Sequence, residues 1–212
     1  MKKFVITIER GFGSGGRSIG MAIAEKLGIN YYDDEILRMA SDESGIDMAL
    51  FQKNDEKISD KISFPFFGRK GVFAGGIIPP DSSKFASEEN LFNYQARVLR
   101  SLHEKESFIA IGRASNHILA DMENVFSFCF QAPFDVCTDV VMDRFAYSKS
   151  EAEKIIRKID KERGDFYYYY TGKKWNDPAW YDLCFNTGKV SWDKCAEILI
   201  KYVEDCLGEK LI

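Results

Sequence analysis

Cysteine and histidine are scarce in this chain of 212 residues, which contains five cysteines and two histidines. The number of cysteines is odd, and no two of them have the C-x-x-C spacing of zinc and redox motifs. This excludes a disulfide-rich secreted framework, and the shortage of histidine speaks against a zinc centre. We expect reduced thiols, most of them buried in a core, at Cys129, Cys137, Cys184, Cys195 and Cys206.

Long apolar stretches are also missing. The apolar run at residues 4–8 ends at Glu9 and Arg10, so it is too short for a signal peptide. No stretch approaches the ~18 apolar residues that span a membrane. The formal net charge of −4 argues against binding to a nucleic acid polymer. We therefore expect a cytoplasmic protein with small-molecule partners, and the sequence leaves its oligomeric state open.

A strand, a glycine-rich loop and a helix follow one another near the start of the chain. Residues 4–8 are β-branched and mostly apolar, which favours a buried strand. The loop holds four glycines, Gly11, Gly13, Gly15 and Gly16. Apolar residues at helical spacing continue to Leu27, and Gly28 is the expected C-cap. Backbone N–H groups and a helix N-terminus together predict a phosphate site.

The loop satisfies two phosphate-binding motifs. Residues 11–16 read G-x-G-x-x-G, the dinucleotide fingerprint, and Asp33 and Asp34 lie where a ribose-binding carboxylate would be. Residues 11–18 also read as a P-loop, G-x-x-x-x-G-K-[ST], with Arg17 in the lysine position. In the P-loop interpretation Arg17 reaches the β- and γ-phosphates of ATP, and the Ser18 hydroxyl binds Mg²⁺. The predicted ATP-binding residues are then Gly11, Gly13, Ser14, Gly15, Gly16, Arg17 and Ser18. A structural glycine turn that binds nothing is the third interpretation.

The rest of the chain alternates strand-like runs with helical segments. The strand-like runs are residues 29–32, 108–111, 125–130 and 182–187. The helical segments are residues 36–40, 47–62, 87–106 and 136–147, a helix opened by a capping box at Ser150 and Glu153, and a last helix capped by Ser191. This order predicts one α/β domain over residues 1–212, a three-layer sandwich with helices on both faces of a parallel sheet.

Several segments resemble the cytidylate-kinase-like proteins, relatives of the bacterial CMP kinases. An arginine commonly replaces the P-loop lysine in that family, in the form S-G-G-R-x-I-G, which here is residues 14–20. Gly112 and Arg113 resemble the family's G-R segment, residues 161–163 resemble its basic lid, and residues 181–183 lead into a final strand. The resemblance implies a P-loop kinase fold and ATP-dependent phosphoryl transfer, with Mg²⁺, to a small acceptor, foremost CMP or dCMP.

The resemblance also implies roles for single residues. Arg17 and Arg163 would be catalytic, and Asp33, Arg38 and Arg113 would bind the acceptor.

Two departures from the family pattern concern the metal and the lid. The related kinases carry an aspartate where this chain has Ile111, so Glu9 and Asp34 are candidate substitutes for the acid that holds the metal. Tyrosines at residues 167–170 stand where the family has lid arginines.

An acceptor-side insert is expected at about residues 47–87 and a lid at about residues 157–181. Residues 63–87 are rich in Gly, Pro and aromatics without a sustained period, which is typical of a functional or mobile loop. Its phenylalanines Phe64, Phe66, Phe67 and Phe73 could cover a base or contact another protein. Residues 164–181 are poor in strand signals and show little apolar patterning, so we expect a lid that is mobile from about residue 162 to residue 179 until substrates bind.

Two other functional classes stay open at this point. The G-x-G-x-x-G motif is compatible with an NAD-type oxidoreductase or dinucleotide-binding protein. The arginine in the lysine position of the P-loop and the tyrosines in place of lid arginines are compatible with a nucleotide-binding module that has no kinase activity.

Overall fold

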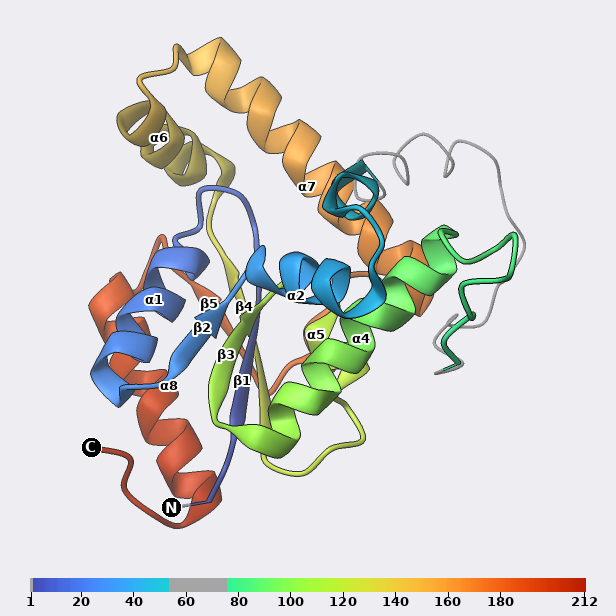
Figure 1. Ribbon diagram of the computed structural model, residues 1–212. Helices are drawn as coiled ribbons and strands as arrows, with labels where there is room; N and C mark the ends of the chain where they lie inside the picture. The colour runs from blue at the N-terminus through green and yellow to red at the C-terminus, as the bar shows by residue number, and fades with distance from the viewer. Residues whose placement is uncertain (1, 54–75) are drawn as a thin grey trace.

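The computed structural model describes residues 2–53 and 76–212, which contain a five-stranded sheet. The strands are β1 (Val5–Arg10), β2 (Asn30–Tyr32), β3 (Phe108–Ile111), β4 (Val125–Gln131) and β5 (Leu183–Asn186). Every pairing is parallel, and the order is β2-β3-β1-β4-β5 (Figure 1). Between β3 and β4 the chain crosses from one side of β1 to the other. The loop after β1 therefore lies at the switch point where open α/β sheets bind ligands.

Helices cover both faces of this sheet. They are α1 (Gly16–Leu27), α2 (Glu35–Ser44), α4 (Glu88–Lys105), α5 (Ser115–Ile118), α6 (Phe134–Phe145), α7 (Lys149–Thr171), the 3₁₀ turn η1 (Pro178–Trp180) and α8 (Trp192–Leu207). α1 and α8 share one apolar core with the sheet, and α2, α4 and the second half of α7 share the other. The predicted three-layer α/β sandwich is confirmed. No helix in the described ranges is both long enough and apolar enough to cross a membrane.

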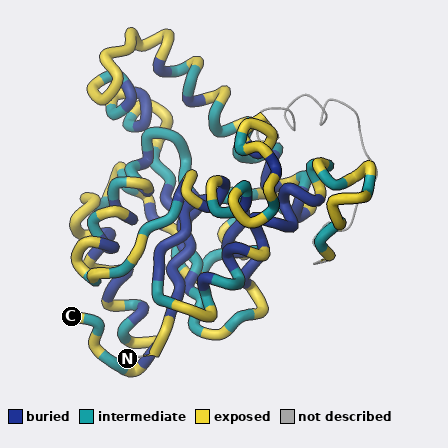
Figure 2. Tube along the Cα trace, in the orientation of Figure 1, coloured by how far each residue is buried: buried dark blue, intermediate teal, exposed yellow. Residues whose placement is uncertain are grey.

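The central strands β1 and β3 are mostly apolar because both of their faces are buried, whereas the edge strands β2 and β5 are partly exposed. Val5 of β1 and Phe108 of β3 belong to the core under α2 and α4, whereas Ile6 and Ile109 belong to the core under α1 and α8. Figure 2 shows the sheet as the dark, buried centre of the molecule. This explains why residues 4–8 and 108–111 read as nearly continuous apolar runs and not as alternating ones.

Glycines set both ends of α1 and its distance from the sheet. The N-cap Gly15 has φ 82° and the C-cap Gly28 has φ 62°, and the N–H of Gly28 donates to two carbonyls of the last turn. The predicted C-cap is therefore confirmed. A Cβ at Gly20 would lie 3.0 Å from the Ile111 side chain and 3.1 Å from that of Ile8, so a side chain here would push the helix away.

The capping box that opens α7 lies two residues earlier than predicted. The Ser148 hydroxyl accepts from the Glu151 backbone N–H, and the Glu151 carboxylate accepts from the Ser148 N–H at 2.9 Å. The prediction of Ser150 and Glu153 is wrong because the sequence holds two overlapping S-x-x-E patterns. Only the first has its serine in the extended conformation that a cap requires.

The expectation of little apolar patterning is wrong for residues 164–171. α7 continues without a break to Thr171, and Phe166, Tyr167 and Tyr170 are buried in the core that includes α4. The Tyr170 ring stacks on Phe92 with centroids 3.9 Å apart. The tyrosine run thus includes the apolar face of a helix that is anchored to the domain.

Two further expectations are met only in part. Cys129, Cys137 and Cys195 are buried, but Cys184 and Cys206 are exposed, and all five thiols are free. Residues 48–53 are helical, in agreement with the start of the helix predicted at residues 47–62. The rest of that helix and the phenylalanines Phe64, Phe66, Phe67 and Phe73 lie outside the described residues.

Candidate functional site

Hydrogen bonds fix the glycine-rich loop between β1 and α1 in one shape. Both the backbone N–H and the hydroxyl of Ser14 donate to the Gly11 carbonyl, at 3.2 and 2.8 Å. The Thr187 hydroxyl after β5 donates to the Ser14 carbonyl at 2.8 Å. The loop is therefore closed on itself and tied to the end of the sheet.

Glycine is required at two loop positions by both conformation and contact. Gly13 has φ +86°, and a Cβ there would lie 2.7 Å from the Cys137 carbonyl of α6. Gly15 has φ +82°, and a Cβ there would overlap the ring of Trp192 at the start of α8. The loop is thus clamped between α6 and α8, and any side chain at either position would displace it.

A cavity of about 220 Å³ opens over this loop and is called the P-loop cavity here. Its lining comprises Arg10, Gly11, Phe12, Gly13, Gly15, Gly16, Arg17, Ser18, Asp33, Val140, Val141, Arg144, Phe145, Arg163 and Trp192. Every predicted ATP-binding residue except Ser14 is among them. Ser14 is fully buried, and its hydroxyl is used inside the loop.

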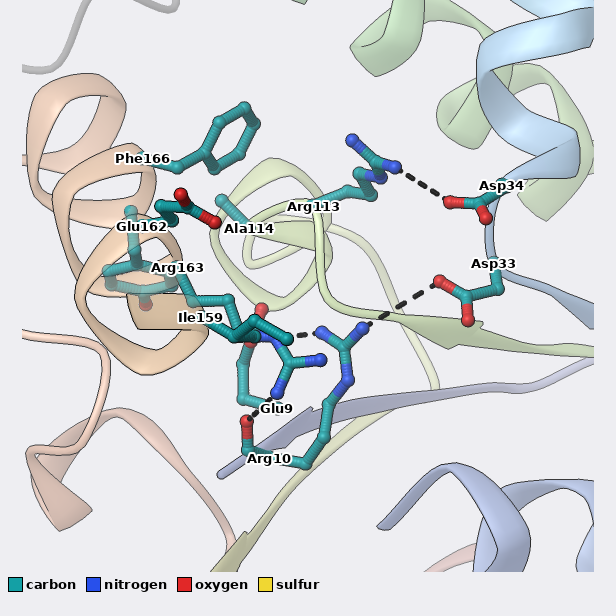
Figure 3. A pocket seen from close by; sticks show the side chains of 11 residues that line it. Glu9, Arg10, Asp33, Asp34, Arg113, Ala114, Ile159, Glu162, Arg163 and Phe166 are labelled. Atoms are coloured by element: carbon teal, nitrogen blue, oxygen red, sulfur yellow. Dashed lines mark hydrogen bonds and ion pairs between the residues drawn. The ribbon is translucent and has the colours of Figure 1, made fainter. Parts of the chain in front are cut away.

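A second cavity, also of about 220 Å³, lies at the carboxyl ends of the strands and is called the strand-end cavity (Figure 3). Its lining comprises Glu9, Arg10, Asp33, Asp34, Arg113, Ala114, Ile159, Glu162, Arg163, Phe166 and Tyr167. Three residues, Arg10, Asp33 and Arg163, line both cavities. The two cavities therefore adjoin along a shared wall.

The predicted acceptor residues lie in different places. Asp33 is buried in the shared wall, with its carboxylate 3.2 Å from Nε of Arg17. Arg113 lines the strand-end cavity, and its guanidinium donates to Asp34 at 2.9 Å. Arg38 is exposed on α2 and belongs to neither lining. The fold thus brings Asp33 and Arg113 to one cavity and leaves Arg38 outside it.

Arg113 belongs to a strained turn after β3. Gly112, Arg113 and Ala114 have φ of 65°, 62° and 53°. Three consecutive residues therefore adopt the left-handed conformation, which is unfavourable for residues other than glycine. A hydrogen bond from the Ala114 backbone to the Glu9 carboxylate helps to hold the turn. Strain of this kind occurs where a site must fix a side chain, here the Arg113 guanidinium at the cavity wall.

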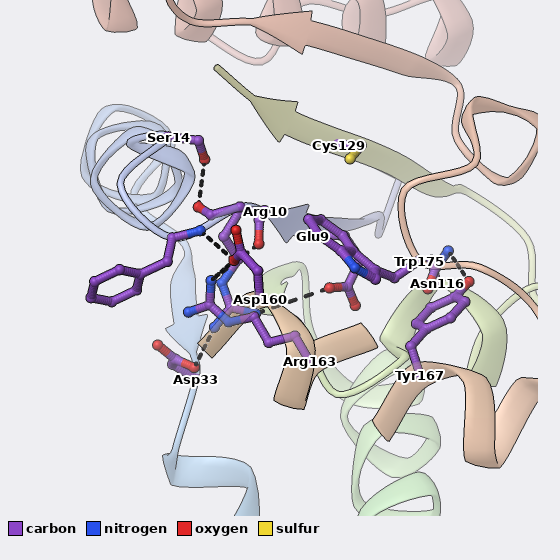
Figure 4. Close-up of polar contacts among 12 residues, drawn as sticks. Glu9, Arg10, Ser14, Asp33, Asn116, Cys129, Asp160, Arg163, Tyr167 and Trp175 are labelled. Carbon is purple, nitrogen blue, oxygen red and sulfur yellow. Dashed lines mark hydrogen bonds and ion pairs between the residues drawn. The ribbon is translucent and has the colours of Figure 1, made fainter. Parts of the chain in front are cut away.

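Half-buried charges of α7 lie beside the shared wall (Figure 4). Arg163 of α7 donates to the Arg10 carbonyl at 3.1 Å. The guanidinium of Arg163 lies 3.7 Å from the Asp160 carboxylate. Asp160 accepts from the backbone N–H of Phe12 at 2.7 Å, which joins α7 to the loop. Burial, followed by the charge of Arg10, lowers the pKa of Arg163 to about 9. An anionic ligand in either cavity would therefore be favourable.

The carboxylate of Glu9 is almost completely enclosed. Burial raises its pKa, against the opposing effects of Arg10 and Arg163. Glu9 lines the strand-end cavity only, and so does Asp34. Neither candidate for the metal-holding acid is therefore in the P-loop cavity.

The P-loop cavity does contain a donor set that suits Mg²⁺. Ser18, which has a hydroxyl, and Asp33, which has a carboxylate, both line it. Mg²⁺ typically takes one or two carboxylates together with phosphate oxygens and waters, so these residues fit the ion if a nucleotide supplies the rest. Within the described ranges no group of three or more His, Cys, Asp or Glu side chains could hold a metal ion alone.

Sequence reasoning missed several residues at or beside the two cavities, among them Arg10, Phe12, Asp160 and Trp192. Arg10 had a local signal, because it is a cation at the end of a buried strand and next to the loop. Trp192 had none, because it reaches the loop only through the packing of α8 against α1.

Comparison with known proteins gives first the class and then the family. A shikimate kinase from Bacteroides thetaiotaomicron matches with a TM-score of 0.51 and 12% identity over 95% of this chain and 98% of that chain, which indicates a P-loop kinase fold. An uncharacterized protein from Eubacterium ventriosum matches with a TM-score of 0.68 and 26% identity over 95% of this chain and 99% of that chain. The model of the cytidylate kinase-like family matches residues 5–189, so the chain belongs to that family. Sequence comparison with curated proteins gave no match. Family and fold together support a P-loop phosphotransferase that uses ATP.

Proposed function

We propose that this protein transfers the γ-phosphoryl group of ATP to the phosphate of a nucleoside monophosphate, CMP or dCMP. The observation that carries this proposal is the shared wall of Arg10, Asp33 and Arg163 between the two cavities. A donor bound at the P-loop and an acceptor in the strand-end cavity would meet there. The choice of a cytidine nucleotide rests on the family to which the chain belongs.

ATP would bind with its phosphates against the loop. The backbone N–H groups of residues 11–16 and the N-terminus of α1 favour negative charge at this point. Arg17 would bind the β- and γ-phosphates. The Asp33 carboxylate, 3.2 Å from Nε of Arg17, would hold the guanidinium in position. Ser18 and Asp33 would hold Mg²⁺, which when bound neutralises phosphate charge.

The acceptor would bind in the strand-end cavity. Arg113, fixed by Asp34, would bind the acceptor phosphate, and the rings of Phe166 and Tyr167 offer an apolar wall for a base. The exposed Arg38 has no part in this proposal.

Transfer would then depend mainly on position and charge. Arg163 would stabilise the transferred group, and it already lies in the shared wall without any closure of a lid.

Binding and turnover assays test the proposal in sequence. Mg²⁺-ATP at 100-fold over its Kd should raise the Tm by roughly 5–10 °C for a chain of this length, and NAD(H) should not. Transfer is then measured with CMP, dCMP, UMP, AMP and shikimate. If NAD(H) raises the Tm and ATP does not, the proposed kinase activity is excluded. Binding of ATP without transfer to any acceptor would favour a nucleotide-binding module.

A further inference from the structure

Arg10 occupies the boundary between the two cavities. It is the last residue of β1 and directly precedes the first glycine of the loop. Its side chain lines both cavities and is only 14% exposed. A group that passed from one cavity to the other would therefore pass the Arg10 guanidinium.

Two glycines leave room for this side chain. A Cβ at Gly112 would overlap Nη1 of Arg10, and a Cβ at Gly16 would lie 2.7 Å from Arg10 Cβ. Gly112 also opens the strained left-handed turn that carries Arg113. The end of β3 and the start of α1 are thus both shaped around Arg10.

The Arg10 guanidinium has donors to spare. Its nearest carboxylate oxygens lie 4.0 Å away on Glu9 and 3.7 Å away on Asp33, which is beyond hydrogen-bond distance. Its buried Nε has no hydrogen-bond partner among the described residues. Since a guanidinium carries five N–H donors and is costly to leave unsatisfied when buried, the site favours an anion with several acceptor oxygens.

The neighbouring arginine adds to this preference. Arg163 donates to the backbone carbonyl of Arg10, so the two side chains enter the same wall from opposite elements. The positive charge of Arg10 contributes to the low pKa of Arg163. An anion between the two guanidinium groups would relieve this repulsion.

Resting on the proposed function, we propose that Arg10 is a catalytic residue that binds the phosphoryl group in transit and stabilises its charge. An oxygen of the acceptor phosphate forms a bond to the γ-phosphorus of ATP. The bond from that phosphorus to the β,γ-bridging oxygen breaks, and its electron pair stays on ADP. Arg10 keeps its proton and donates to the non-bridging oxygens, while Glu9 and Asp33 position it.

Three variants test this role. Arg10→Met removes the charge at similar length, Arg10→Lys keeps a point charge, and Arg97→Met is the control because Arg97 is 58% exposed and pairs with Glu43 away from both cavities. Transfer kinetics, the Kd of Mg²⁺-ATP and the Tm are measured for each. We expect Arg10→Met to lower kcat by ~10²-fold or more with the Kd of ATP changed less than ~3-fold, because the contact forms mainly during transfer. Arg10→Lys should be intermediate, since lysine lacks the planar fork, and Arg97→Met should match wild type.

Other outcomes overturn the inference in distinguishable ways. If wild type transfers and a folded Arg10→Met variant keeps its kcat, the role of Arg10 fails and the proposed function stands. If the Kd of ATP weakens as much as kcat falls, Arg10 is a ground-state ligand of ATP. Should Arg10→Met not fold, an unchanged kcat in Arg10→Lys overturns the role. If wild type transfers to no acceptor, the proposed function and the role of Arg10 fall together.

Discussion

At the scale of single residues, the central question is how an arginine serves in the lysine position of a P-loop. Arginine is planar and needs orientation, whereas lysine is a compact point charge. Asp33 supplies orientation here, because its carboxylate lies 3.2 Å from Nε of Arg17, and Asp33 is itself buried. The Arg17 side chain is still 56% exposed, so it remains accessible from the P-loop cavity. Asp33 lines both cavities and so belongs to the proposed donor side as well as to the proposed acceptor side.

We expect Arg17→Ala to lower kcat/KM by at least ~10²-fold, the scale of losing one preorganised charge beside a developing anion. Arg17→Lys should retain part of the activity, because it keeps the charge but not the contact through Nε. Steady-state kinetics with CMP or dCMP measure both. Lys26→Ala is the control, since Lys26 is an exposed cation in the last turn of the same helix. Full activity in Arg17→Ala would mean that the loop binds phosphate through its backbone alone.

A comparison of two glycines with positive φ separates the cost of backbone strain from the cost of a steric clash with a neighbouring element. Gly13 has φ +86° and a Cβ there would approach the Cys137 carbonyl, whereas Gly28 has φ +62° and open space around it. Gly28→Ala should cost only the left-handed strain, about 1–2 kcal/mol of the free energy of unfolding. Gly13→Ala should in addition displace the loop and weaken ATP binding by at least ~10-fold. Denaturant unfolding and ATP titration measure the pair, and equal ATP affinity in both variants would contradict a rigid loop.

At the scale of elements, α7 joins two different environments. Its first half packs with α6 in a small separate core of Cys137, Val141, Ala152 and Ile156. Its second half is buried against α4, where Tyr170 is fully enclosed. Figure 1 shows α6 and the first half of α7 as a hairpin that projects beyond the sheet, and residues 143–151 at its tip are all exposed.

This division predicts an uneven hydrogen-exchange pattern along one helix. Amides of residues 166–171 should be protected nearly as well as those of β1 with or without ligand, because their opening requires loss of the larger core. Amides of residues 149–156 should exchange faster and become protected when ATP and the acceptor bind. Exchange followed by mass spectrometry in both states provides the comparison, with β1 as the internal reference. Fast exchange of residues 166–171 without ligand would restore the mobile lid expected from the sequence.

At the scale of the whole molecule, the sequence was most informative where the chemistry is local. The strand, glycine loop and helix of residues 4–28 carry their own signals, so the phosphate-binding loop could be predicted from them, and the alternation of strands and helices along the chain predicted the fold class. The strand-end cavity was harder to predict, because it is assembled from β1, β2, β3 and α7. Phe166 and Tyr167 of α7 reach it only through tertiary packing. The tyrosine run was harder to predict because Tyr167 and Tyr170 lie on the buried face of α7 while Tyr168 is exposed, and this pattern depends on packing against α4.

The adjoining cavities make a last prediction about the molecule as a unit. A bisubstrate analogue that links adenosine and cytidine through a phosphate chain should bind roughly 10²-fold or more tightly than ATP, because the second nucleoside then binds at high effective concentration. Isothermal titration gives both affinities. Arg113→Met should reduce the affinity for the analogue and leave that for ATP unchanged, because Arg113 lines only the strand-end cavity. An analogue that binds no more tightly than ATP, or an Arg113→Met variant that weakens both ligands equally, would mean that the two cavities do not act as one donor and acceptor site.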